Sequence, residues 1–175
     1  LITYLDAAMK HMATTGTLNT KPGGILYFKI DDPVFRKKEK KTKEEIEAEI
    51  IKQLKMKGLL LADVKLVRHM HRELTGYSHV IPAFINKDGA LGRSSAATAE
   101  QFDLLRNHVN RLLKKLGGEI LNGDISIKPF KNKRSTSCTY CDYSSICQFD
   151  SSIEENKYKV IKDLKNEEFW KILGE

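Results

Sequence analysis

Apolar residues at helical spacing predict most of the helices in this chain. In four stretches they recur every three or four positions, which places them on one face of an α-helix. The four sets are Leu1, Leu5, Ala8 and Met12; Ile46, Ile50 and Leu54; Val67, Met70 and Leu74; and Phe102, Leu105, Val109, Leu112, Leu116 and Ile120. The last set is the longest and predicts one extended amphipathic helix.

Residues that cap helices stand at several of the expected boundaries. Thr98 and Gln101 match a capping box, in which each side chain accepts a hydrogen bond from the other residue's backbone N–H. Asp63 is placed to cap the third helix, and Asn166 to cap a final helix near the C-terminus. Helix ends are expected at Thr15, at Gly58 and at the pair Asn122-Gly123.

Strands are predicted where apolar runs are bounded by turn residues. The runs are 25–30, 79–85 and 125–127, and the second is closed by the turn Asn86-Lys87-Asp88-Gly89. The first run is apolar on nearly both faces, as in a sheet that is covered on two sides. Together the patterns predict a mixed α/β fold with more helix than strand.

Length and composition describe an ordinary globular chain. Its 175 residues can bury a core, and we expect them to form one unit. No apolar stretch approaches the roughly 18 residues of a membrane span, and Asp6 and Lys10 interrupt the first apolar run, which excludes a secretory signal. A cytoplasmic protein without a membrane partner is therefore expected. Because the chain starts with Leu1 inside an expected helix, we also expect it to be a piece of a longer protein.

Positive charge is concentrated in two places. The net charge is +7, which is compatible with a polyanionic partner without establishing one. The run 36–43 holds six basic residues and is equally compatible with a solvated loop or helix face. The second group, Lys128, Lys131, Lys133 and Arg134, leads directly into the cysteines, so residues 128–150 form one basic and cysteine-rich segment.

All three cysteines lie within ten residues, at Cys138, Cys141 and Cys147. An odd number of cysteines in an intracellular protein argues against a disulfide scaffold. Three cysteines in a loop rich in Thr, Tyr, Asp and Ser are also unlike core packing, so the spacing favours a metal site. Zinc sites and iron–sulfur clusters both usually have four soft protein ligands. The fourth is either a histidine, His79 or His108, in a zinc site, or a cysteine outside this chain.

Four segments resemble a known family. They are Lys131 to Arg134 followed by Cys138 to Asp150; Pro22 to Phe28; Lys57 to Asp63; and Gly89 to Ser95. Each is similar to a segment in the C-terminal part of AddB, the second subunit of the bacterial AddAB ATP-dependent helicase–nucleases. The resemblance runs along essentially the whole chain and implies the C-terminal portion of an iron–sulfur nuclease domain of the PD-(D/E)XK type.

The resemblance implies cofactors, partners and site residues. Cys138, Cys141 and Cys147 match three ligands of a [4Fe–4S] cluster whose fourth cysteine lies far upstream. Tyr4 matches the Tyr of a Gln-x-x-x-Tyr motif near DNA, and Lys131, Lys133 and Arg134 are candidate DNA contacts. The implied partners are DNA and an AddA-type helicase–nuclease subunit in a heterodimer. The implied activity is exonucleolytic processing of duplex DNA ends for recombinational repair.

The catalytic residues of such a nuclease are expected outside this chain. The family uses Mg²⁺ held by two acidic residues, with a nearby Lys, upstream of the helix that carries Tyr4. Asp63-Val64-Lys65 imitates the motif, but such triplets arise by chance in a chain with 30% charged residues, so Asp63 is expected to cap a helix. The sequence has no Gly-rich phosphate-binding loop followed by Lys, so no ATP site is predicted in this chain.

Two other functions fit the same residues. One is a zinc module without enzymatic activity that binds nucleic acid, and a histidine ligand would favour it. The other is a Cas4-like or other iron–sulfur nuclease, which has a similar C-terminal cysteine run. The long insert between Asp32 and Glu100 favours the AddB resemblance over the Cas4-like one.

Overall fold

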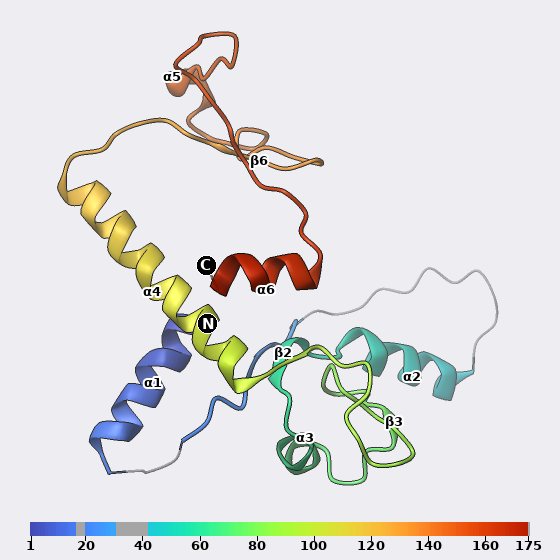
Figure 1. Cartoon of the computed structure of the whole chain (residues 1–175). Coiled ribbons are helices and arrows are strands. Elements are labelled where there is room, and N and C mark those ends of the chain that lie inside the picture. The colour runs from blue at the N-terminus through green and yellow to red at the C-terminus, as the bar shows by residue number, and fades with distance from the viewer. Residues whose placement is uncertain (17–19, 31–41, 175) are drawn as a thin grey trace. The chain divides into compact units, whose positions relative to one another are not determined.

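The structure is a computed structural model that describes residues 1–16, 20–30 and 42–174. The chain forms two compact units, Leu1–Asn110 and Arg111–Glu175, and each is considered by itself (Figure 1). Both contain helices and short strands, which confirms the expected mixed α/β class. No helix in the described ranges is long and apolar enough to cross a bilayer.

The first unit is built on a three-stranded mixed sheet. Its strands are β1 (Gly24–Tyr27), β2 (Lys57–Leu61) and β5 (Ala96–Ala97), in the order β1-β2-β5. β2 pairs antiparallel with β1 and parallel with β5. A second, two-stranded sheet joins β3 (Gly76–Tyr77) to β4 (Phe84–Ile85).

The core of this unit lies where the central strand meets a short helix and the loops that follow it. Six buried residues form one apolar cluster: Leu60, Val67, Leu74, Ile81, Ala83 and Ile85. Leu60 comes from β2 and Val67 from α3 (Val64–Met70). Burial of the Leu, Ile and Val side chains among them stabilises each by about 1.5–3 kcal/mol, so this cluster holds the sheet and α3 together.

Helix starts in the first unit follow local capping chemistry. Asp63 caps α3, because its Oδ1 accepts hydrogen bonds from the backbone N–H of Lys65 at 2.8 Å and of Leu66 at 3.4 Å. The capping box before α4 (Ala99–Leu121) is also confirmed: Thr98 N–H donates to Gln101 Oε1 at 2.9 Å, and Gln101 N–H to Thr98 Oγ1 at 3.2 Å. Both helices therefore begin where the sequence places them.

Two further helices complete the first unit. α1 (Ile2–Thr14) matches the first expected helix. α2 (Lys43–Gln53) ends earlier than the expected boundary at Gly58. Gly58 instead lies in β2 with φ 147°, and a Cβ there would meet the carbonyl oxygen of Ile25 on β1 at 2.0 Å. The glycine thus serves the close approach of two strands and not the end of a helix.

The second unit contains the C-terminal part of α4, a short parallel ladder and two helices. The ladder joins β6 (Phe130–Lys131) to β7 (Lys159–Val160), with Phe130 opposite Lys159 and Lys131 opposite Val160. Between the two strands lies the cysteine segment with the short helix α5 (Ser144–Cys147). The C-terminal helix is α6 (Asn166–Gly174).

Two strand predictions were wrong because side chains capture the backbone in turns. Residues 79–83 are not a strand: the hydroxyl of Ser78 accepts hydrogen bonds from the N–H of Val80 and Ile81, which bends the chain before β4. Residues 125–127 are not a strand either, since Asp124 Oδ1 accepts from the N–H of Ser126 at 2.9 Å.

Two other boundaries also differ from expectation. The first strand ends at Tyr27, and Phe28 and Ile30 are exposed, so the expected cover on both faces is wrong for this end of the strand. The sheet order makes β1 an edge strand, with one neighbour. Asn166 is the first residue of α6 and not its cap; the residue before it, Lys165, donates its backbone N–H to Glu168 Oε2 at 3.2 Å.

Candidate cysteine site and basic groove

The three cysteines lie on successive tight turns of one loop in the second unit. Cys141 N–H donates to the carbonyl of Cys138 at 3.4 Å, and Cys147 ends α5 with its N–H bonded to the carbonyl of Tyr143 at 2.8 Å. All three are free thiols; Cys138 and Cys141 are half-buried and Cys147 is exposed. The loop therefore offers three accessible sulfur donors within a short span.

The donor chemistry of this loop fits a thiophilic metal, but the loop is not closed around one. In the described ranges, no three His, Cys, Asp or Glu side chains are grouped so that they could hold a metal ion. This statement includes the cysteines and also His79 and His108, the candidate fourth ligands. The assignment of Cys138, Cys141 and Cys147 as metal ligands stays a prediction.

One aromatic residue ties the cysteine loop to the neighbouring ladder. Tyr158, just before β7, packs edge-on against Phe149 with ring centroids 4.8 Å apart. Burial raises the pKa of the Tyr158 hydroxyl, and the Cys138 side chain beside it raises that pKa further. Lys131 Nζ lies 5.0 Å from the centroid of the Tyr158 ring, at cation–π distance. Both ends of the cysteine segment are thus anchored at one aromatic ring.

A groove of about 820 Å³ runs beside this ring. Its lining includes four lysines, Lys131, Lys133, Lys157 and Lys162, and the apolar or aromatic side chains of Tyr158, Val160 and Ile161. We call these seven residues the lysine groove. The β6–β7 pairing builds it, because this pairing brings the segment around 131 next to the segment around 160.

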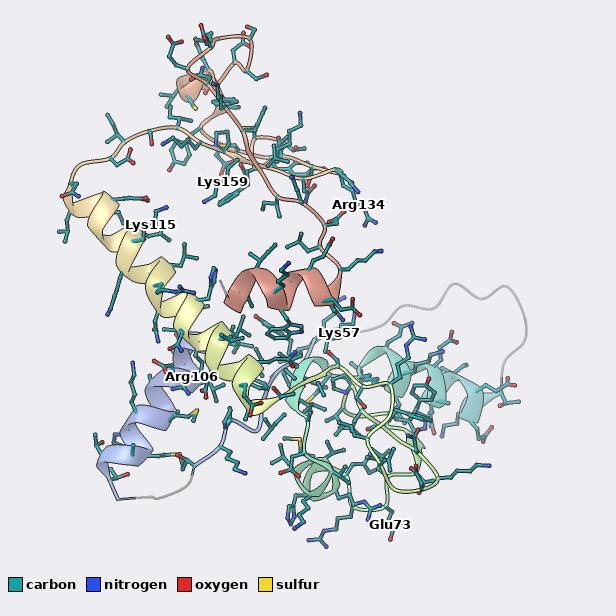
Figure 2. The ribbon with its side chains drawn as sticks, viewed as in Figure 1. Lys57, Glu73, Arg106, Lys115, Arg134 and Lys159 are labelled. Atoms are coloured by element: carbon teal, nitrogen blue, oxygen red, sulfur yellow. The ribbon has the colours of Figure 1, made fainter. Side chains whose placement is uncertain are left out.

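The predicted basic residues do not all lie in the lysine groove. Lys131 and Lys133 line it, whereas Arg134 is exposed and does not line it; its backbone N–H donates to Asn132 Oδ1 in a turn (Figure 2). Sequence reasoning missed Lys157 and Lys162, since the signal that gathers them is a strand pairing that the sequence does not show. Of the basic run 36–43, residues 36–41 lie outside the described residues.

Tyr4 lies on α1 of the first unit, and its side chain is 78% exposed. Two residues further along the helix, Asp6 is the only buried residue of α1 in the described part of the chain. The carboxylate of Asp6 is held by side chains from both α1 and α4. Tyr4 is therefore displayed on a helix whose inner side is fixed by an ionic cluster.

Four hydrogen bonds define the Asp6 cluster. Asp6 Oδ1 accepts from Arg106 Nε at 3.0 Å and Arg106 Nη2 at 2.5 Å, and Asp6 Oδ2 accepts from Lys10 Nζ at 2.7 Å and Asn110 Nδ2 at 3.2 Å. These donors, Lys10 first and Arg106 next, hold the pKa of Asp6 well below its usual range. The cluster links α1 to α4 through side chains, and Figure 2 labels its arginine, Arg106, on α4.

Asp63 shows no arrangement for catalysis. Its Oδ1 is occupied by the two backbone N–H groups at the start of α3.

His71, at the other end of α3, hydrogen-bonds through Nδ1 to the buried hydroxyl of Ser78 at 3.0 Å. Because that hydroxyl already accepts two backbone N–H bonds, it donates to His71, and this occupies one nitrogen of the ring.

The chain is similar in sequence to proteins of a known superfamily. The sequence model of the PD-(D/E)XK nuclease superfamily matches residues 1–148. Relatives named as one subunit of an ATP-dependent helicase/deoxyribonuclease are 52% identical in Acetivibrio thermocellus and 50% in Ruminiclostridium cellulolyticum, each over the whole chain, and 51% in Clostridium novyi over 99% of it. The chain spans about 15% of the length of these relatives.

Proposed function

Since the chain belongs to the PD-(D/E)XK nuclease superfamily, we propose that it is part of the exonuclease domain of a helicase–nuclease subunit that processes double-stranded DNA ends. The observation that carries this proposal is the combination of the superfamily match with about 50% identity, along the whole chain, to subunits named helicase/deoxyribonuclease. In the intact protein the domain cuts DNA in the cytoplasm, in a heterodimer with an AddA-type helicase–nuclease subunit, during recombinational repair.

The catalytic metal site is proposed to lie outside this chain. Nucleases of this superfamily use divalent ions, and Mg²⁺ would supply a bound hydroxide and stabilise charge on the phosphate. Asp63 is already engaged as a helix cap, which supports a structural role for it. The chain's own contribution is then to bind DNA, through Tyr4 on α1 and through Lys131, Lys133 and Arg134 before the cysteines.

The cysteine loop is proposed to hold an iron–sulfur cluster. Cys138, Cys141 and Cys147 would supply three thiolates to a [4Fe–4S] cluster, and a cysteine elsewhere in the intact protein the fourth. Free thiols, sulfur exposure and the neighbouring lysines support this assignment. A bond network from this loop to a distant cysteine would close a long chain loop, and a cross-link that closes ~100 residues stabilises by about 4.7 kcal/mol in the simple entropy model. The cluster would therefore be structural.

The proposed activity is tested with the intact subunit and its partner. Incubation with ATP and Mg²⁺ should degrade linear duplex DNA and leave covalently closed circles intact, because only the linear form has ends. The 175-residue chain alone should cut neither substrate, with Mg²⁺ or with Mn²⁺. Cleavage by the chain alone that is abolished in Asp63→Ala would show that the catalytic site is here after all. Equal degradation of closed circles would refute processing from DNA ends.

A further inference from the structure

We propose that the lysine groove of the second unit is a binding site for unpaired DNA, in which lysines hold the phosphates and an apolar floor contacts the bases. The inference rests on the proposed function and adds to it a site and a form of substrate. It includes Lys157, Lys162, Val160 and Ile161, which the sequence alone does not connect with DNA.

The charges of the groove select an anion. Four lysines border it, and its lining holds one carboxylate, Asp163, which lies 3.8 Å from Lys133 Nζ with both side chains largely exposed. Such an exposed pair contributes little, about 0–1 kcal/mol, and opens readily in favour of a phosphate. In the described part of the chain no ion pair involves Lys131, Lys157 or Lys162. The groove thus carries a local excess of positive charge that suits a phosphate backbone.

The floor of the groove distinguishes a single strand from a duplex. Val160 is 64% exposed and Ile161 50% exposed, although both are branched apolar residues, the first in the ladder and the second just after it. In a duplex the base faces are stacked and covered, so lysines reach phosphates but an apolar floor gains no contact. In an unpaired strand the base faces are open and can bury these apolar side chains, while the backbone follows the positively charged groove. Apolar and cationic surface side by side therefore fits unpaired DNA best.

The ladder holds this surface in a fixed register. The N–H of Ile161 donates to the carbonyl of Lys131 at 2.8 Å, next to the pairing of Lys131 with Val160. Tyr158 is clamped between Phe149 and the ammonium of Lys131. Backbone bonds therefore set the floor and one side of the border at the same time, so little ordering is left for the moment of binding.

A neighbouring concave surface shows why this groove, and not the basic charge of the unit in general, is the proposed site. That surface also holds four lysines, Lys115, Lys128, Lys159 and the shared Lys157, but Glu119, Asp124 and Glu155 line it as well. Lys115 Nζ lies 3.8 Å from Glu119. Its charges nearly balance, so it lacks the excess that would hold a phosphate backbone.

The test measures binding of fluorescein-labelled oligothymidylate to the full chain by anisotropy over a series of salt concentrations. For single strands each phosphate contact contributes about −0.7 to the slope of log affinity against log salt. Lys157→Ala/Lys162→Ala removes two phosphate contacts and should reduce the magnitude of the slope by about 1.4. If the variant and the unaltered chain bind equally at 1 M salt, this change makes the variant bind about tenfold more weakly at about 0.2 M salt. Lys157→Arg/Lys162→Arg should restore the slope, because it keeps both charges.

A matched control removes the same charge elsewhere. Lys65→Ala/Lys87→Ala changes two exposed lysines of the first unit and should leave the slope unchanged. Val160→Thr/Ile161→Thr keeps branched residues at the ladder and should weaken binding of the single strand with no change in slope. The same variant should leave binding of an oligo(dA)·oligo(dT) duplex unaffected.

Two outcomes would overturn the inference. In one, Lys157→Ala/Lys162→Ala binds the single strand with the slope of the unaltered chain. In the other, the floor variant weakens duplex and single-strand binding equally, which assigns the groove to DNA of either form. Neither result would contradict the proposed function. Failure of the proposed function would appear separately, as a lack of DNA-end degradation by the intact subunit with its partner.

Discussion

Removing the carboxylate of Asp6 is expected to lower the free energy of unfolding of the chain by about 3 kcal/mol. Breaking a buried ion pair by deleting one partner costs about 3–5 kcal/mol, because the other charge is left buried and unpaired. In this cluster the side chain of Asp6 is 8% exposed and that of Arg106 17%. The lower end of the range applies, since Arg106 Nη1 keeps a hydrogen bond to Asp103 at 2.9 Å. Asp6→Ala is therefore measured by urea denaturation at neutral pH, followed by circular dichroism.

A double-mutant cycle separates the ionic contribution from simple loss of packing. Arg106→Met alone should cost less than Asp6→Ala, since Asp6 then loses the two hydrogen bonds from Arg106 but keeps those from Lys10 and Asn110. Asp6→Ala with Arg106→Met removes both charges and should cost clearly less than the sum of the two single changes. Lys10→Ala is the control: the side chain of Lys10 is 68% exposed, so its loss should cost no more than about 1 kcal/mol.

The same carboxylate should make the stability depend on acid. The pKa of Asp6 is depressed in the folded chain, so its stabilisation is complete above the unfolded-state value of 3.8 and is lost as the pH falls below that value. The difference in stability between the unaltered chain and Asp6→Asn should be constant near neutrality and shrink below about pH 4. Additive single-variant costs, or a difference that grows in acid, would refute the ionic cluster as the basis for packing α1 on α4.

Three further changes test other parts of the structure. Thr98→Ala removes the capping box of α4 and should cost about 1 kcal/mol in urea denaturation; no loss would mean that the box is not formed. Gly58→Ala puts a Cβ 2.0 Å from a carbonyl oxygen of the facing strand and should destabilise by more than the roughly 1 kcal/mol typical of a point change; an unchanged midpoint would contradict the close β1–β2 approach. Replacing Lys131, Lys133 and Arg134 together by Ala should flatten the salt dependence of DNA affinity, and a triple variant with an unaltered slope would clear these residues of a role.

Most of the helices were predictable because their signals are local. The period of the apolar residues, the carboxylate of Asp63 and the pair Thr98–Gln101 act within one or two turns of the backbone, and the structure has these caps as expected. The fold class and the family followed from the same local information together with the cysteine spacing. For the starts of these two helices, a capping signal within a few neighbouring residues is sufficient.

The strands and the groove were predicted less well, because strand pairing depends on distant segments and because local turns at Ser78 and Asp124 replace two expected strands. A strand needs a partner strand to pair with. The alternating residues 125–127 pair with no strand, and the backbone N–H of Ser126 is bonded to Asp124 in a turn instead. The parallel pairing of Lys131 with Val160 joins segments on the two sides of the cysteine loop. The spacing of apolar residues in the sequence does not predict such a pairing. The contribution of Lys157 and Lys162 to the groove is therefore visible only in the structure.

The most direct test of the central claim, that residues 138–147 are the iron–sulfur loop of a DNA-end nuclease, is the metal content of the intact protein purified without oxygen. Iron and acid-labile sulfide should be present in equal amounts, with visible absorbance from thiolate-to-iron charge transfer. Changing Cys138, Cys141 or Cys147 singly to Ala should remove the iron and the sulfide and lower resistance to protease. Stoichiometric zinc without sulfide in the unaltered protein would contradict the claim and assign the cysteines to a zinc site.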